Sequence, residues 1–164
     1  MNATQFYEQL SDQLSILPKN QRIAFAVNIC DRLLPDYIDF YAQFNWGNPD
    51  ILKRSIQCAK NAIANVVDEH EVKQLLAELE AVLPDTEEFT DPLGTYALNA
   101  ACALFELLEY LLNQEIDHLL NISSTITDTI DFKLSELEED LNEDEILNHP
   151  EMLKEWHHQL QISK

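Results

Sequence analysis

Residues 93–112 read LGTYALNAACALFELLEYLL and contain the most apolar stretch of the chain, residues 97–112. Leucine and alanine occur on nearly every face of the helix that this segment predicts. A helix that is apolar nearly all round is typical of the centre of a bundle, because a surface helix needs a polar face. Asn99, Glu106 and Glu109 interrupt the apolar run, which is therefore too short and too polar to cross a bilayer.

The segments on both sides of this stretch also have the three- and four-residue apolar spacing of helices. The chain contains only two glycines, whereas tight β-hairpins usually need glycine at positive φ. The fold class is therefore all-α: a single compact bundle of six or seven helices in one domain, residues 1–164. The expected helices cover residues 4–17, 20–34 with a break or kink at Pro35 and a helical continuation over 37–44, 49–67, 72–83, 93–112, 115–141 and 150–162. A loop is expected at 84–92.

The formal net charge of −20 is distributed unevenly along the chain. Residues 1–60 contain six basic and six acidic side chains, so the later residues carry the whole net charge. Such a surface repels the phosphates of nucleic acids and anionic membranes, and it attracts basic proteins. We therefore expect no nucleic-acid partner, no membrane partner and a basic or mixed-charge protein partner.

The first residues lack the basic stretch and apolar run of an export signal, so we expect a cytoplasmic protein. Cys30, Cys58 and Cys102 are odd in number, far apart in sequence and flanked by helix-forming residues. A disulfide framework or a zinc knuckle would space its cysteines differently. We expect three buried free thiols.

The chain resembles the bacterial domain-of-unknown-function family number 416, the YjaG-like proteins. The resemblance rests on four landmarks that together span nearly the whole chain. They are Cys30-Asp31-Arg32 with Leu34-Pro35-Asp36-Tyr37; the aromatic-glycine turn before the helix with Arg54; Leu83-Pro84 and Phe89 leading to Tyr96-Ala97 and residues 100–104; and Asn148-His149-Pro150-Glu151 with Glu155-Trp156. Relative to the family pattern, this chain ends sooner after Trp156. The resemblance implies an all-helical cytoplasmic bacterial protein with no established activity.

Two Glu-x-x-His pairs carry the sharpest chemical pattern in the sequence: Glu115 with His118, and Glu155 with His158. The i, i+3 spacing places a carboxylate and an imidazole on one helix face, where both can hold one metal ion. Two such pairs with two further glutamates form the di-metal site of ferritin-like bundles. Thirty acidic residues and five histidines also produce such pairs by chance, so a metal site is the alternative hypothesis, and we predict no cofactor.

A run of acidic residues begins within the last turns of the sixth expected helix, extends beyond it and forms the candidate binding surface. Its seven carboxylates are Glu136, Glu138, Glu139, Asp140, Glu143, Asp144 and Glu145. A solvated helix back explains such a run as well as a docking surface does. Asn142 and Glu145 also fit a capping box at the start of a helix.

The sequence contains no G-x-S-x-G, P-loop or dinucleotide-binding fingerprint. We therefore interpret the chain as a non-enzymatic acidic interaction protein, for example one that neutralises a basic toxin as immunity proteins do. A ferritin-like metal-binding protein or enzyme is the first alternative. A structural homodimer formed through the apolar stripe of the sixth helix is the second.

Overall fold

The computed structural model describes residues 1–164 and consists of eight helices with no strand. The all-α prediction is confirmed. The helices are α1 (Ala3–Ile16), α2 (Lys19–Phe44), α3 (Pro49–Ala64), α4 (Glu69–Glu80), α5 (Pro92–Asn113), α6 (Ile116–Leu137), α7 (Glu143–Leu147) and α8 (Pro150–Ile162). No helix is both long enough and apolar enough to span a membrane.

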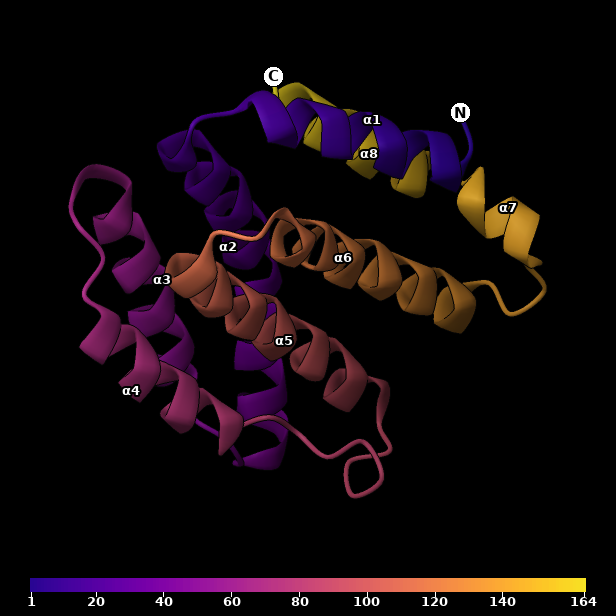
Figure 1. Ribbon diagram of the computed structural model, residues 1–164. Coiled ribbons are helices and arrows are strands. Elements are labelled where there is room, and N and C mark those ends of the chain that lie inside the picture. Colours follow the sequence, from indigo (N-terminus) through magenta and orange to yellow (C-terminus); the bar gives the residue numbers. More distant parts are fainter.

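Helix α5 lies at the centre of the molecule, as its apolar surface predicts (Figure 1). It packs most extensively against α2 and α6, and it also contacts α3 and α4. Half of its 22 residues are buried, which only a helix with neighbours on several sides achieves. One hydrophobic core of 39 buried residues draws on all eight helices.

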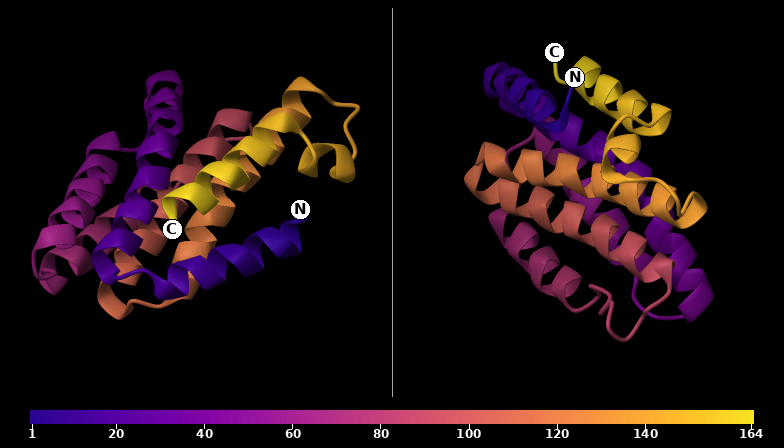
Figure 2. Two further views of the ribbon diagram at one scale, coloured as in Figure 1. Left: turned by 90° about the horizontal axis from the view of Figure 1, so that it is seen from above. Right: turned by 90° about the vertical axis from the view of Figure 1, so that its right-hand side faces the viewer.

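Helices α1 and α8 lie together on one side of the bundle, above α6 (Figures 1 and 2). Phe6 of α1 stacks on Trp156 of α8, with ring centroids 5.1 Å apart and an interplanar angle of 11°. The hydroxyl of Ser163 after α8 donates to the side chain of Gln13 on α1 at 2.6 Å. The first and last helices are thus neighbours in space, and both pack on α6.

Two boundaries differ from the sequence prediction. Helix α2 continues through Pro35, which is exposed, so neither half of the helix ends there. The sixth helix ends at Leu137, four residues earlier than predicted, and α7 follows as a separate short helix. Asn142 and Glu145 form the predicted capping box of α7, which explains why a new helix begins at this point.

The turn between α2 and α3 depends on Gly47 and Tyr37. Gly47 has φ +94°, a backbone conformation that residues with a Cβ atom rarely adopt. The buried Tyr37 hydroxyl accepts from the Asn48 amide at 3.2 Å and donates to the Val82 carbonyl at 2.8 Å. A Cβ atom on Gly47 would overlap this hydroxyl, so the turn has two separate reasons for a glycine.

The aromatic residues beside this turn form a packed cluster at one end of the bundle. Phe40 is buried and contacts Phe44, Trp46 and Phe89, with ring centroids 5.0 to 6.2 Å apart. Tyr41 is exposed, and its ring makes none of these contacts. The cluster therefore closes the end of the core.

Candidate protein-interaction surface

The seven carboxylates of the acidic run are all exposed and lie where α6 ends and α7 begins. Glu136 is in the last turn of α6, Glu138 caps that helix, and Glu139 and Asp140 belong to the connecting loop. The remaining three, residues 143–145, form the first turn of α7. This corner projects at one end of the molecule (Figure 1). We call these seven residues the acidic corner.

The acidic corner has almost no internal charge compensation. None of its carboxylates lies within 4.0 Å of a lysine or arginine nitrogen. The one basic side chain near the corner is the imidazole of His149, whose Nε2 is 3.9 Å from Glu138 Oε2. The last turn of α6 also contains no basic residue to offset the negative end of the helix dipole. The corner therefore presents concentrated negative charge to solvent.

An apolar side chain lies within this charged surface. Leu137 continues the apolar stripe of α6 beyond the packed body of the protein, and 81% of it is exposed. Leu137 and the partly buried Leu141 line an open hollow of about 690 Å³, and the rest of its lining is acidic. The hollow can accommodate an apolar side chain while cationic groups meet the surrounding carboxylates.

The four candidate metal ligands lie in two separate places. Glu115 is exposed at the start of α6, whereas Glu155 and His158 lie on α8. No three His, Cys, Asp or Glu side chains come together in an arrangement that could hold a metal ion. The structure therefore does not combine the two Glu-x-x-His pairs into one site.

The first pair is split by hydrogen bonds to other residues. His118 Nδ1 is 2.6 Å from Glu106 Oε2 on α5. Its Nε2 is 3.0 Å from Nδ2 of Asn113, whose Oδ1 accepts from the Glu115 amide. Because an amide nitrogen only donates, Nε2 accepts and the proton of the neutral ring lies on Nδ1. Both ring nitrogens are therefore occupied, and the histidine joins the ends of α5 and α6.

In the second pair, the acidic member is buried and forms an ion pair with a partly exposed arginine instead. Both carboxylate oxygens of Glu155 accept from Arg32 of α2, at 2.6 and 2.9 Å. The exposed fractions are 7% for Glu155 and 33% for Arg32. His158 Nε2 lies 3.1 Å from Asn28 Oδ1, which also accepts from Arg32. This network attaches α8 to α2.

Sequence reasoning missed the Arg32–Glu155 pair because its members are 123 positions apart. A signal was nevertheless present. Met152, Glu155 and Gln159 follow one another at spacings of three and four, which places the glutamate on the buried face of α8. A carboxylate on a buried face needs a partner, and an arginine is the best match for two oxygens.

The apolar stripe of α6 is used within the chain. Leu119, Ile122, Ile126 and Leu134 are buried, and the helix packs against α5, α2, α1 and α8. A second copy of the chain would therefore have to use another surface, such as the exposed Phe132 or Leu137.

The three cysteines are free, and burial raises the pKa of each thiol. Cys30 and Cys58 are buried, and the pKa of Cys58 rises to about 11. Cys102 is half-buried, and Glu106 raises its pKa further. A raised pKa keeps the thiol protonated at neutral pH, which opposes nucleophilic chemistry.

A protein-family model described as "Protein of unknown function (DUF416)" matches residues 9–164. The chain belongs to this family. The family resemblance predicted from the sequence is thereby confirmed. A DUF416 family protein from Shewanella baltica OS155 has the same fold, with a TM-score of 0.83 and 22% identity over 93% of this chain and 81% of that one.

Curated relatives of the DUF416 chain include the uncharacterized protein YjaG from two bacteria. The Escherichia coli K12 protein is 26% identical over 153 residues, which cover 92% of this chain and 78% of the relative. The Salmonella typhimurium LT2 protein is 25% identical with the same coverage. These names state no activity.

Proposed function

We propose that this DUF416 protein is a non-enzymatic interaction protein that binds a basic protein partner through the acidic corner. The observation that carries the proposal is a set of seven exposed carboxylates with no lysine or arginine partner, five of which line one hollow together with the exposed Leu137. Isolated surface leucines are common, and solvated acidic runs are common. Their combination on one projecting corner matches what a cationic, partly apolar segment of a partner needs.

The charge of the corner acts mainly on the rate of association. Complementary charge steers a partner toward its docking surface and accelerates binding, and added salt screens the effect. A small acidic protein that neutralises a basic toxin is one concrete form of this function, because rapid capture would limit damage.

The test is a pull-down from the lysate of the source bacterium, at low and moderate salt. It compares the wild-type protein with two variants that have the same net charge as each other. The corner variant replaces Glu138, Glu139, Asp140 and Glu143 with lysine. The control variant makes the same change at exposed acids without an ion pair elsewhere: Asp39, Glu80, Glu87 and Glu88. We expect wild type and control to capture one basic protein that dissociates as salt rises, and the corner variant to lose it.

Equal capture by the corner variant and the control would refute the proposal. Once the partner is purified, the association rate gives a second readout. Reversal at the corner should slow association, whereas dissociation in moderate salt should change less. Equal association rates for the corner variant and wild type would also contradict a charge-steered surface.

A further inference from the structure

Helices α1 and α8 contact each other and rest mainly on α6. We call this pair the terminal layer. The body beneath it, α2 to α6, has far more extensive helix packing, with α5 against α2 and α6 as its largest interfaces. In the right-hand view of Figure 2 the terminal layer lies to one side of the other long helices. Local stability follows the density of buried contacts, so the terminal layer and the body are expected to differ.

The interface beneath the terminal layer is unusually polar. Seven polar or charged residues of the protein are buried, and four of them lie between the layer and its support: Ser123, Thr127, Glu155 and Gln159. Ser123 donates to Gln159, and Thr127 pairs with Tyr7 of α1 at 3.1 Å. A buried hydrogen bond contributes a net of about 1 kcal/mol, less than the burial of a leucine side chain. These polar contacts therefore fix the position of the layer, but each contributes less free energy than a buried leucine would.

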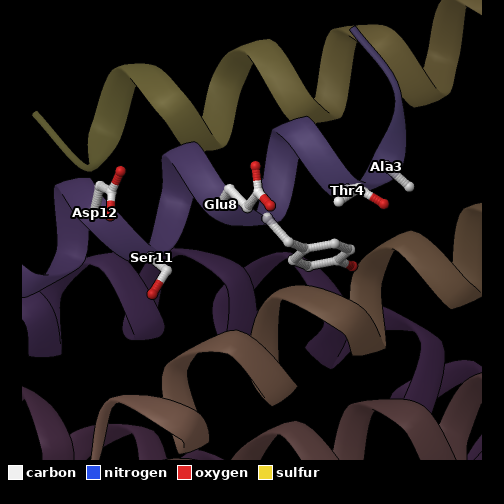
Figure 3. A pocket seen from close by; sticks show the side chains of 6 residues that line it. Ala3, Thr4, Glu8, Ser11 and Asp12 are labelled. Atoms are coloured by element: carbon white, nitrogen blue, oxygen red, sulfur yellow. The ribbon is translucent and has the colours of Figure 1, made fainter.

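Three open hollows adjoin the terminal layer. The largest, about 740 Å³, runs along α1 and is lined by residues including Thr4, Glu8 and Ser11 (Figure 3). A second of about 350 Å³ lies beside the Arg32–Glu155 pair, and a third of about 330 Å³ separates the start of α1 from α7. The buried Nε1 of Trp156 also lacks a hydrogen-bond partner. A buried donor without a partner is costly, so this unpaired indole N–H reduces the free energy that holds the layer closed.

The two helices of the layer are nevertheless tied to each other. Phe6 stacks on Trp156, and Gln13 accepts a hydrogen bond from Ser163. Arg22 of α2 donates to the carbonyls of Leu14 and Ser15 at 2.8 and 2.9 Å. These hydrogen bonds attach the C-terminal end of α1 to the body. A movement of α8 therefore removes support from α1, and the reverse also holds.

We propose that α1 and α8 open together, as one unit, from a body formed by α2 to α6 that stays folded. The Arg32–Glu155 ion pair, which joins α8 to α2, stabilises the closed form of the layer. Opening exposes the apolar inner face of the layer, including Phe6, Leu10 and Leu14, which are fully buried in the closed form. The fold thus contains a conformational switch that offers an apolar surface distinct from the acidic corner. This inference does not depend on the partner-binding proposal.

Native-state hydrogen exchange on the full chain, at rising but sub-denaturing urea, tests this proposal. We expect the slowest amides of α1 and α8 to share one opening equilibrium, and to exchange at least about tenfold faster than those of α5. Glu155→Gln should accelerate exchange in both α1 and α8 by about tenfold or more, because it leaves the Arg32 charge without its partner. Glu151→Gln, an equal change at an exposed residue of α8, should have a much smaller effect, limited to the lost interaction with the helix N-terminus.

A second, milder variant allows the same measurement if Glu155→Gln does not fold. Phe6→Leu changes only α1, yet it should accelerate exchange in α8 through the lost stacking on Trp156. Three results would overturn the proposal: equal protection of the layer and α5, a response of α8 without α1, or equal acceleration throughout the body.

Discussion

Replacing Gly47 with alanine should destabilise the protein far more than its single added methyl group suggests. The residue has φ +94°, where a side chain at Cβ costs about 1–2 kcal/mol. The new Cβ would also overlap the Tyr37 hydroxyl and displace it. That hydroxyl makes two hydrogen bonds, to Asn48 and Val82, worth about 1 kcal/mol each. The expected loss is about 3–4 kcal/mol, a large part of the roughly 5–15 kcal/mol of a typical domain.

A double-mutant cycle separates the two causes. Tyr37→Phe removes the hydroxyl and its two hydrogen bonds, and should lower the free energy of unfolding by about 2 kcal/mol. In this background Gly47→Ala meets no hydroxyl, so only the backbone contribution of about 1–2 kcal/mol should remain. The two changes are therefore expected to couple by about 2 kcal/mol, measured by urea denaturation followed by circular dichroism.

Gly94 provides the matched control for this cycle. A Cβ atom at Gly94 would meet the backbone carbonyl and Cβ of Phe89, not Tyr37. Gly94→Ala should also be destabilising, but Tyr37→Phe should not reduce its effect. Additive effects of Gly47→Ala and Tyr37→Phe within about 0.5 kcal/mol would refute the explanation of the turn.

Three other outcomes follow from the structure. Partial desolvation of the exposed Asp128 carboxylate, and then the neighbouring Asp131, raise the pKa of Asp128. The folded chain thus binds this proton more tightly than the unfolded chain, so the free energy of unfolding should fall as pH rises through the raised pKa. Asp128→Asn should therefore stabilise modestly at pH 7 and lose this advantage near pH 3, measured by urea titrations at both pH values. With a thiol reagent at neutral pH, the half-buried Cys102 should react first, Cys58 slowly, and Cys30 only on unfolding; simultaneous reaction would contradict the described burial. Saturating Mn²⁺ or Fe²⁺ should leave the melting temperature unchanged, and a rise would revive the metal hypothesis.

The helices were predictable because their causes are local. The apolar stretch around α5 required burial on several sides, and Asn48 and Asp91 begin α3 and α5 with side-chain caps that can be recognised from sequence. Of the predicted break or kink at Pro35, the break does not occur, because the proline is exposed and tertiary contacts hold α2 on both sides. The end of α6 was placed too far along because Leu141 continues the apolar spacing after the helix has stopped.

The polar contacts were not predictable because they join distant positions. The Glu-x-x-His spacing correctly places Glu155 and His158 on the same helix, but it contains no information about Arg32 or Asn28, which occupy their polar atoms. The same holds for Lys133, which reaches Asp36 of α2 at 2.9 Å. Spacing along one helix identifies side chains that can act together, and only the packing of a second helix determines which partner they meet.

The acidic corner contains two groups of carboxylates with different physical origins. Residues 143–145 lie in the first turn of α7, where negative charge stabilises a helix, and Glu145 completes the capping box. Glu136 and Glu138 lie at the opposite kind of helix end, where the same charge is unfavourable and no basic residue offsets it. Local helix chemistry therefore accounts for the acids of α7 but not for those at the end of α6. The acids at the end of α6, beside the exposed Leu137, are the ones that a cationic partner would stabilise most.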